Sequence, residues 1–336
     1  MHIPDNYLSP ATCAAMAVAV APAWVLSVKK VSKELPKEKI PLLGIGAAFS
    51  FLLMMFNVPL PGGTTGHAVG GTLLAVLIGP HAACIAITIA LLIQALIFGD
   101  GGILSFGANC FNMAFVIPFL GYALYKLFKG WAKSKTGEYL GLAVASYLAI
   151  NVAALCAALE FGLQPLVARD AAGLPLYCPY PLAVSIPAML IPHLAVAGVV
   201  EAAFTVAIVA YITKVSPGMI YSGQPTKTKP LFALIAALVV ASPLGLLAAG
   251  TAWGEWGSDE IKEVVSGGSA LGFVPSGMAK GFAFSAPLPD YAVTGIPEVL
   301  GYIVSAVLGA ALLVIVFKLL GLLRKDAAEK TPAEEN

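Results

Sequence analysis

Charged residues are scarce in this chain of 336 residues. Asp, Glu, Lys and Arg together make up only 11% of it, whereas ordinary soluble domains contain about 25%. Hydrophobic residues make up 59%, and the mean hydropathy is +0.89. Most hydrophobic runs approach the roughly 20 residues that cross a bilayer and are too long for buried strands of about 4–8 residues in a soluble α/β enzyme. We therefore expect an all-α polytopic membrane protein.

Signatures of catalysis are also missing. The sequence contains no GxxxxGK[ST] phosphate loop, no HExxH pair and no nucleophile elbow. Its five cysteines are scattered without a CxxC pair, which argues against a disulfide framework or a thiolate metal site. The net charge of +1 comes with basic residues confined to a few loops and indicates no nucleic-acid partner. We expect no enzyme activity, and any ATP-driven process requires an ATPase on another polypeptide.

About nine membrane-spanning helices are predicted from the apolar runs. With the N-terminus outside, sixteen of the nineteen Lys and Arg residues fall on the cytoplasmic side, as the positive-inside rule requires. The C-terminus is then cytoplasmic. The predicted spans cover roughly residues 11–28, 42–60, 67–79, 81–98, 103–128, 139–163, 184–213, 230–252 and 296–323.

The third predicted span is too short. Its thirteen residues, HAVGGTLLAVLIG, form about 20 Å of helix, against a hydrocarbon core of about 30 Å. The preceding loop, NVPLPGGTTGH, contains two prolines and three glycines. Irregular backbone at membrane depth is tolerated where it is packed in protein or lines a polar cavity. We therefore expect a loop that dips into the membrane and carries His67 into a pocket open to the outside.

The chain divides into a core and a smaller module. A membrane core of about seven helices is expected over residues 1–213, followed by a cytoplasmic linker over 214–229. Two further helices over 230–325 enclose an outer loop at 253–295, and a polar cytoplasmic tail follows at 326–336.

The chain starts with MHIPD, and these residues can chelate a metal. The α-amine of Met1, the backbone nitrogen of His2 and the His2 Nδ1 atom can enclose one ion in fused five- and six-membered rings. The backbone nitrogen must first lose its proton, and the chelate tolerates no leader before Met1. A second imidazole completes a plane of four nitrogens, which favours Ni(II) or Cu(II), with Co(II) as a near neighbour. Pro4 restricts the backbone and helps to hold the segment in a pocket.

His67 is expected to supply the second imidazole, because the predicted topology places it on the outer side with His2. The alternative interpretation is that His2 is a solvated tail residue. His81 is expected to be an interfacial residue at an inner turn. His193 lies within a span and is either an outer-shell partner of a ligand or a histidine satisfied within the helix bundle.

The acidic residues are left without a metal-binding role. Glu160 and Glu201 lie within spans, where each either hydrogen-bonds in the bundle or marks an ion path. Asp100 in FGDGGI is interpreted first as turn chemistry and second as an attraction for cations. Four acids of the outer loop fit a solvated face slightly better than a role in metal loading: Glu255, Asp259, Glu260 and Glu263.

Three stretches carry a family resemblance: MHIPDNYLSP, PGGTTGHAVGGTLLAVLIGP and LLIQALIFGDGGILSFGANCFNMA. Through them the chain resembles, over roughly residues 1–220, the CbiM/NikM family of substrate-binding membrane subunits of energy-coupling-factor transporters for cobalt and nickel. The resemblance implies that Met1, His2 and His67 hold Ni²⁺ or Co²⁺ as the transported substrate. The C-terminal APLPDYAVTG and the apolar helix after it resemble the two-helix NikN/PDGLE-like accessory subunit, here fused, with PDYAV in place of the PDGLE signature.

The resemblance also implies partners and a location. The subunit would capture metal outside, associate with a transmembrane coupling (T) protein and two cytoplasmic ATPase subunits, and lie in the lipid bilayer of a prokaryotic inner (cytoplasmic) membrane as a multi-pass protein. Its first helix presents Ala11, Ala15 and Ala19 on one small face, which we expect to pack within the subunit rather than against the coupling protein. A self-sufficient carrier driven by an ion gradient and an intramembrane metalloenzyme are the rival interpretations.

Overall fold

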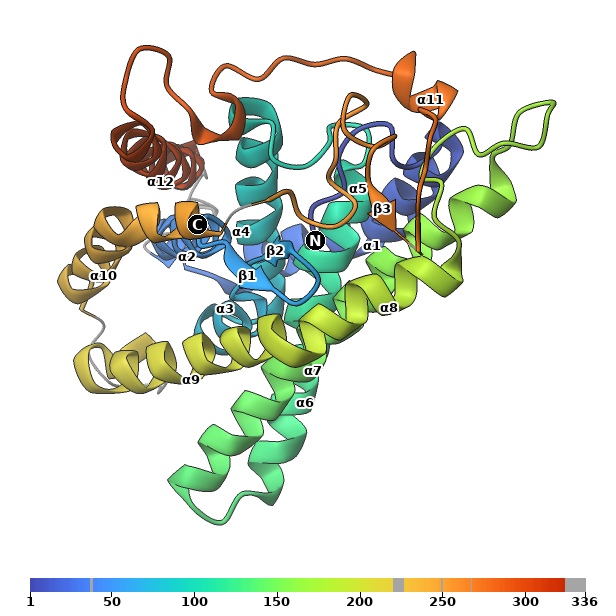
Figure 1. The fold of residues 1–336 in the computed structure, drawn as a ribbon. Helices are drawn as coiled ribbons and strands as arrows, with labels where there is room; N and C mark the ends of the chain where they lie inside the picture. Colours follow the sequence, from blue (N-terminus) through green and yellow to red (C-terminus); the bar gives the residue numbers. More distant parts are fainter. Residues whose placement is uncertain (37–38, 220–226, 249, 267, 324–336) are drawn as a thin grey trace, which may run out of the picture.

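Helices dominate the computed structural model of the chain (Figure 1), which confirms the predicted all-α fold class. The structure describes residues 1–36, 39–219, 227–248, 250–266 and 268–323. The predicted polar tail at 326–336 and residues 220–226 of the predicted linker lie outside the described residues.

The first helix, α1 (Pro10–Glu34), begins where its sequence provides a cap. The Ser9 side chain accepts a hydrogen bond from the Thr12 amide at 3.2 Å, and Pro10 occupies the first helical position, where its fixed φ and missing N–H are tolerated. The other α-helices are α2 (Ile40–Met54), α3 (Gly71–Ile78), α4 (Pro80–Ile93), α5 (Phe106–Asn109), α6 (Ile117–Trp131), α7 (Lys135–Val167), α8 (Leu182–Pro192), α9 (Gly198–Val215), α10 (Lys229–Ala241), α11 (Ser276–Ala279) and α12 (Glu298–Leu323).

Short irregular helices and two hairpins complete the fold. Strands β1 (Val58–Leu60) and β2 (Thr64–Gly66) pair antiparallel, as do β3 (Val265–Ser266) and β4 (Ser269–Ala270). Three π-helical segments extend α4 or join neighbouring helices, and such segments are frequent at functional sites: η2 (Gln94–Phe98), η3 (Cys110–Val116) and η4 (His193–Ala197). The 3₁₀ turns are η5 (Pro217–Met219), η6 (Ser242–Leu247) and η7 (Pro289–Tyr291).

Each of the nine predicted spans contains a helix, but seven helical stretches among the described residues are long and apolar enough to cross a membrane. Helix α2 has 15 residues and α3 has eight. Both are shorter than predicted: the β1–β2 hairpin takes the last residues of the second predicted span, and residues 67–70 of the third are not helical. The left-handed backbone of Gly70, with φ 73°, then starts α3, so His67 precedes the helix instead of lying in it.

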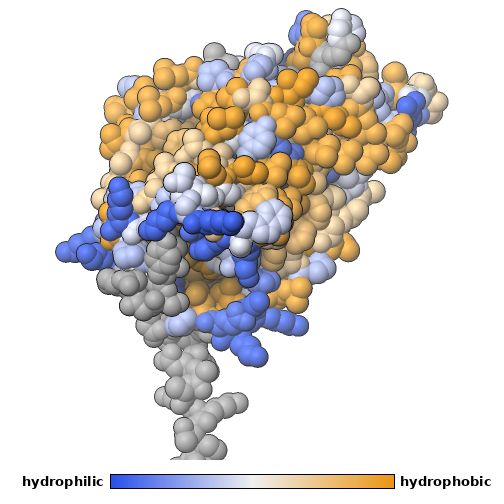
Figure 2. Space-filling view, turned by 90° about the horizontal axis from the view of Figure 1, so that it is seen from below, coloured by the Kyte–Doolittle hydropathy of each residue, from blue (hydrophilic) through white to orange (hydrophobic). Residues whose placement is uncertain are grey.

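Large hydrophobic side chains point outward from several helices. On α7 the exposed ones include Leu140, Val144 and Leu148, and on α12 they include Val304 and Val307. Seen from below, much of the molecular surface is hydrophobic, with hydrophilic side chains gathered over part of it (Figure 2). Hydrocarbon rather than water suits such a surface, and the chain is a multi-pass membrane protein.

The face of α1 with small residues does not pack within the subunit. Ala11, Ala15 and Ala19 are exposed, so the expectation that this face is used internally was wrong. The close contact instead involves Ala17, because a Cβ atom added to Gly107 of α5 would lie 2.6 Å from the Ala17 backbone. The glycine allows α1 and α5 to approach.

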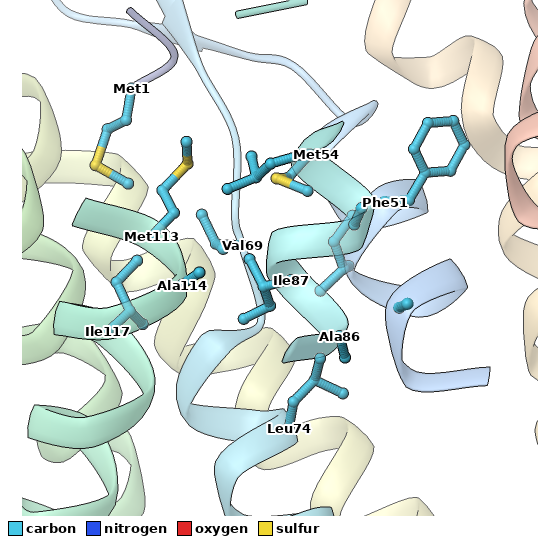
Figure 3. Packing of buried hydrophobic residues seen from close by; sticks show 14 of the residues in the cluster. Met1, Phe51, Met54, Val69, Leu74, Ala86, Ile87, Met113, Ala114 and Ile117 are labelled. Atoms are coloured by element: carbon cyan, nitrogen blue, oxygen red, sulfur yellow. The ribbon is translucent and has the colours of Figure 1, made fainter. Parts of the chain in front are cut away.

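The C-terminal helix packs directly on the core, so the loops before it reach the N-terminus. Helix α12 lies along α2 (Figure 1), and a Cβ atom at Gly309 would lie 2.2 Å from the Phe51 ring. The side chain of Met1 enters the same group of buried hydrophobic residues as Met113 and Val69 (Figure 3). The first residues of the chain are therefore part of the core.

Candidate metal-binding site

The N-terminal segment is fixed by hydrogen bonds to the turn before α5. Met1 and His2 are buried, and Ile3 is completely inaccessible. The Ile3 amide donates to Asn109 Oδ1 at 2.8 Å, while Asn109 Nδ2 and the Gly102 amide donate to the Ile3 carbonyl at 3.0 and 2.8 Å. Buried backbone groups need such partners, and these bonds satisfy both polar groups of Ile3. The position of His2 is thereby defined.

Gly102, the second glycine after Asp100 in the FGDGG turn, lets the N-terminal segment approach closely. The Asp5 carboxylate accepts hydrogen bonds from the amides of Ile103 at 3.1 Å and Leu104 at 2.7 Å. A Cβ atom at Gly102 would lie 2.4 Å from the Asp5 backbone nitrogen, so no other residue fits. The turn and the N-terminal segment are complementary in shape and in hydrogen bonding.

Two histidines that are distant in the sequence meet at this segment. The Nε2 atom of His67 lies 3.3 Å from the Nδ1 atom of His2, and the ring centroids are 4.9 Å apart. The Nδ1 atom of His67 lies 3.2 Å from the carbonyl oxygen of Ala68. A proton on Nδ1 would be donated to that carbonyl, which leaves the Nε2 lone pair facing His2.

Burial keeps the His67 ring neutral. It lowers the pKa of His67 well below its ordinary value, and the positive charges of the N-terminal amine and His2 lower it further. Neutral imidazole is the form that binds metals. The site therefore offers a free ring nitrogen at neutral pH.

A buried carboxylate supports the loop that carries His67. Glu201 on α9 accepts hydrogen bonds from the Val69 amide at 2.8 Å and from the Gly70 amide at 3.1 Å. Of the two roles considered for Glu201, the structure shows the hydrogen-bonding one. Its partners are the amides two and three residues after His67, so Glu201 fixes the loop that carries that ring.

Asp100 belongs to the site as well as to its turn. Its Oδ1 atom lies 2.9 Å from His2 Nδ1, and its Oδ2 atom accepts hydrogen bonds from Tyr291 Oη at 2.5 Å and Gln94 Nε2 at 3.1 Å. Burial alone would raise the pKa of Asp100, but His2 and the Tyr291 hydroxyl hold it below its ordinary value. Asp100 therefore places a carboxylate beside the His2 ring. This position fits the second interpretation of Asp100, that it attracts cations.

The site opens into a polar cavity of about 520 Å³. His2 and His67 line it together with side chains from the C-terminal part of the chain. The Met1 amine lies 3.6 Å from Glu255 Oε1, and burial raises the pKa of Glu255 against the opposing effect of that amine. Four carboxylates line this cavity: Asp100, Glu255, Asp290 and Glu298.

The outer-loop acids therefore differ in their roles. Glu255 faces the N-terminus, and the expectation that it forms part of a solvated face was wrong. Asp259, Glu260 and Glu263 are exposed, as expected for such a face. The reason is local: Gly254, with φ 83°, turns the chain so that its next residue enters the cavity.

The other candidate residues lie elsewhere. His193 Nδ1 lies 2.7 Å from the Met189 carbonyl oxygen one turn earlier, which is the arrangement of a histidine satisfied in the bundle. His81 Nδ1 contacts Ser27 Oγ at 3.1 Å, and Glu160 accepts a hydrogen bond from Asn112 at 2.9 Å. Sequence reasoning missed Asn109, Gln94 and Tyr291; Asn109 and Gln94 do occur within one of the family-like stretches.

The family match gives the class: a multi-pass membrane protein for transport of a transition metal. Residues 2–219 match the family described as the cobalt uptake substrate-specific transmembrane region, and the chain belongs to that family. Residues 227–326 match the PDGLE domain.

Relatives match along nearly the whole chain. The Probable fused nickel transport protein LarMN of Lactiplantibacillus plantarum is 54% identical over 91% of this chain and 93% of its own length. The Fused nickel transport protein NikMN of Rhodobacter capsulatus is 48% identical over 94% of this chain and 95% of its own. A crystal structure of a truncated transition metal transporter, 54% identical, superposes with a TM-score of 0.61 over 64% of this chain and 99% of that one.

Proposed function

We propose that this chain is the substrate-specific subunit of an ATP-driven nickel importer, and that it captures the ion on the outer face. The ligands are the Met1 amine, the backbone nitrogen and Nδ1 of His2, and Nε2 of His67. The contact between His2 and His67 carries the proposal. Metal–imidazole bonds are about 2.0–2.1 Å long, so neighbouring nitrogens in a square plane lie about 2.8 Å apart. The observed 3.3 Å requires only a small closure.

Nickel is proposed over cobalt for two reasons. A plane of four nitrogens favours Ni(II) among the ions that such transporters carry. The relatives that match along nearly the whole length are named as nickel transport proteins. Co(II) is a near neighbour in coordination chemistry, and the family's description names cobalt uptake.

The energy source is proposed to lie on other polypeptides. The chain has no phosphate-binding loop, so ATP would be hydrolysed by two cytoplasmic ATPase subunits acting through a transmembrane coupling protein. In this assembly, residues 1–213 form the metal-binding core and residues 230–325 the accessory module, with the N-terminus outside the cytoplasmic membrane of a prokaryote. The location of the basic residues supports this orientation.

Two measurements test the proposal. Isothermal titration of the purified chain with Ni²⁺ should show one site, and His67→Ala should remove it while the unfolding transition is retained. In proteoliposomes the chain alone should not accumulate ⁶³Ni²⁺ under a proton or sodium gradient, whereas co-reconstitution with a coupling protein and two ATPases should give ATP-dependent uptake. Gradient-driven uptake by the chain alone would instead support the carrier interpretation.

A further inference from the structure

Tyr291 has a backbone conformation that tyrosine rarely adopts. Its φ is 62°, and the preceding Asp290 has φ 53° and ψ 29°. Bulky residues with positive φ are outliers that need a compensating interaction, and such outliers concentrate at functional sites. The sequence here is PDYAV, and the PDGLE signature that names the matched domain has glycine in the third place, where positive φ costs little. This chain keeps the turn but places a tyrosine on it.

The tyrosine side chain compensates through contacts with the core. It is buried, and its ring stacks on Phe98 with centroids 4.8 Å apart. Its hydroxyl donates to Asp100 Oδ2 at 2.5 Å and receives a hydrogen bond from Gln94 Nε2 at 2.9 Å. The segment is anchored beside it, because the Leu288 amide donates to the Ile97 carbonyl at 2.9 Å. Tyr291 of the C-terminal module therefore packs against η2 and hydrogen-bonds to it.

Asp100 connects this tyrosine to a proposed metal ligand. While Oδ2 is held by Tyr291, Oδ1 lies 2.9 Å from His2 Nδ1. The other ring nitrogen of His2, Nε2, is buried and has no hydrogen-bond partner among the described residues. The polar contacts of the ring are therefore those at Nδ1, with Asp100 and His67. Whatever fixes the Asp100 carboxylate therefore fixes a negative charge 2.9 Å from the ring nitrogen that would bind the metal.

We propose that Tyr291 is a positioning residue for the metal site. Its hydroxyl holds Asp100, and the Asp100 carboxylate orients the metal-free His2 ring through Nδ1 and leaves a negative charge beside the cation once the metal replaces the proton on Nδ1. The accessory module is thereby coupled to metal affinity through a single side chain. This inference rests on the proposed function, because it takes His2 to be a ligand.

The test measures Ni²⁺ affinity of the full-length chain and four variants by isothermal titration. Residues that hold a metal ligand from outside typically change affinity 10–100-fold when altered, so Tyr291→Phe, which keeps the ring, should weaken binding by about tenfold. Asp100→Asn should weaken it at least as much. The double variant should be no weaker than Asp100→Asn alone, because both changes act through one contact.

Tyr302→Phe is the matched control. Tyr302 lines the same cavity, lies beside Tyr291, and donates its hydroxyl hydrogen bond to the Met55 carbonyl at 2.7 Å instead of to Asp100. The Ni²⁺ affinity of the Tyr302→Phe variant should stay within about twofold of that of the parent chain, even if its unfolding temperature falls as much as that of Tyr291→Phe. A merely structural role would move both variants alike.

Two results would overturn the inference: unchanged affinity in Tyr291→Phe, or losses that multiply in the double variant. Should Tyr291→Phe fail to fold, Gln94→Met takes its place, because it removes the other donor to Asp100 Oδ2. Gln94→Met must then weaken Ni²⁺ binding in the parent chain and have no further effect in the Asp100→Asn variant. Failure of the proposed function is distinguishable, because then His67→Ala would bind Ni²⁺ as tightly as the parent chain.

Discussion

The Nε2 atom of His67 lies 3.3 Å from the Nδ1 atom of His2, across a sequence separation of 65 residues. Two loops that contain no regular helix create this contact. One is the N-terminal segment, fixed to the turn before α5 through Ile3. The other follows the β1–β2 hairpin and is fixed by Glu201. Each of these supports can be removed by a substitution that leaves every proposed ligand in place.

Removal of the Glu201 carboxylate should release the His67 loop. Glu201→Ala leaves the buried amides of Val69 and Gly70 without an acceptor, at about 1–3 kcal/mol each, so the free energy of unfolding should fall by about 2–5 kcal/mol. Ni²⁺ affinity should fall by at least about tenfold, while Glu201→Gln, which retains one acceptor oxygen, should lose less. Glu160→Gln is the control, since that carboxylate bonds Asn112 and should leave affinity unchanged. Equal affinities in Glu201→Ala and the parent would refute the supporting role.

Loss of the Asn109 side chain should loosen the N-terminal segment. Asn109→Ala leaves the Ile3 amide without an acceptor and removes one donor to its carbonyl, which should destabilise the fold by about 1–3 kcal/mol. Ni²⁺ affinity should fall as well, because Met1 and His2 are no longer held in place. Ser146→Ala is a suitable control: its hydroxyl bonds only within its own helix, to Leu142 and Ala143. Thermal unfolding and isothermal titration measure both effects, and a variant that lost stability alone would show that the segment does not need this anchor.

Acid should weaken metal binding through the N-terminal nitrogens rather than through His67. Burial lowers the pKa of His67, so this ring stays neutral below the ordinary histidine value of about 6.5 and does not compete for the metal. The Met1 amine and the His2 amide must still lose protons, and each proton released makes affinity fall about tenfold per pH unit. Titrations in buffers of different ionisation enthalpy should find at least one proton released per Ni²⁺, and an affinity equal at pH 6 and pH 7.5 would rule out amide coordination.

The lowered pKa of His67 also predicts how the stability of the metal-free protein depends on pH. Because folded His67 has a lowered pKa, the unfolded chain binds more protons between the folded value and about 6.5. The free energy of unfolding of the metal-free protein should therefore decrease as the pH falls through 6.5. Replacement of His67 by Gln should flatten this decrease in chemical unfolding curves.

The sequence predicted the helices well because hydropathy and length decide them. The predicted span 139–163 lies within α7, and the predicted span 296–323 matches α12 to within two residues. Predictions were poorer where hydrogen bonds of loops decide the structure. The hairpin at 58–66 shortened the second predicted span, because its strands pair with each other instead of continuing α2, and the left-handed Gly70 delayed the start of α3.

Only the nitrogen donors of the candidate site could be predicted from the sequence. The chelating potential of Met1 and His2 follows from their chemistry and needs no tertiary information. Glu255 and Tyr291 lie far along the chain, and their places beside the N-terminus depend on α12 packing on α2. The positive φ of Tyr291 could not be predicted either, since tyrosine gives no signal for a left-handed backbone.

The most direct test of the account is Ni²⁺ binding by a chain with one glycine inserted between Met1 and His2. The insertion keeps both histidines but enlarges a chelate ring and displaces the amine. The control carries a glycine inserted after Gly173, in an exposed loop, and mass spectrometry confirms that Met1 is the first residue of each protein. We predict that Ni²⁺ binding collapses in the first protein, with its unfolding transition retained, and is unchanged in the control. Unchanged binding in both proteins would contradict the N-terminal chelate and place the metal elsewhere.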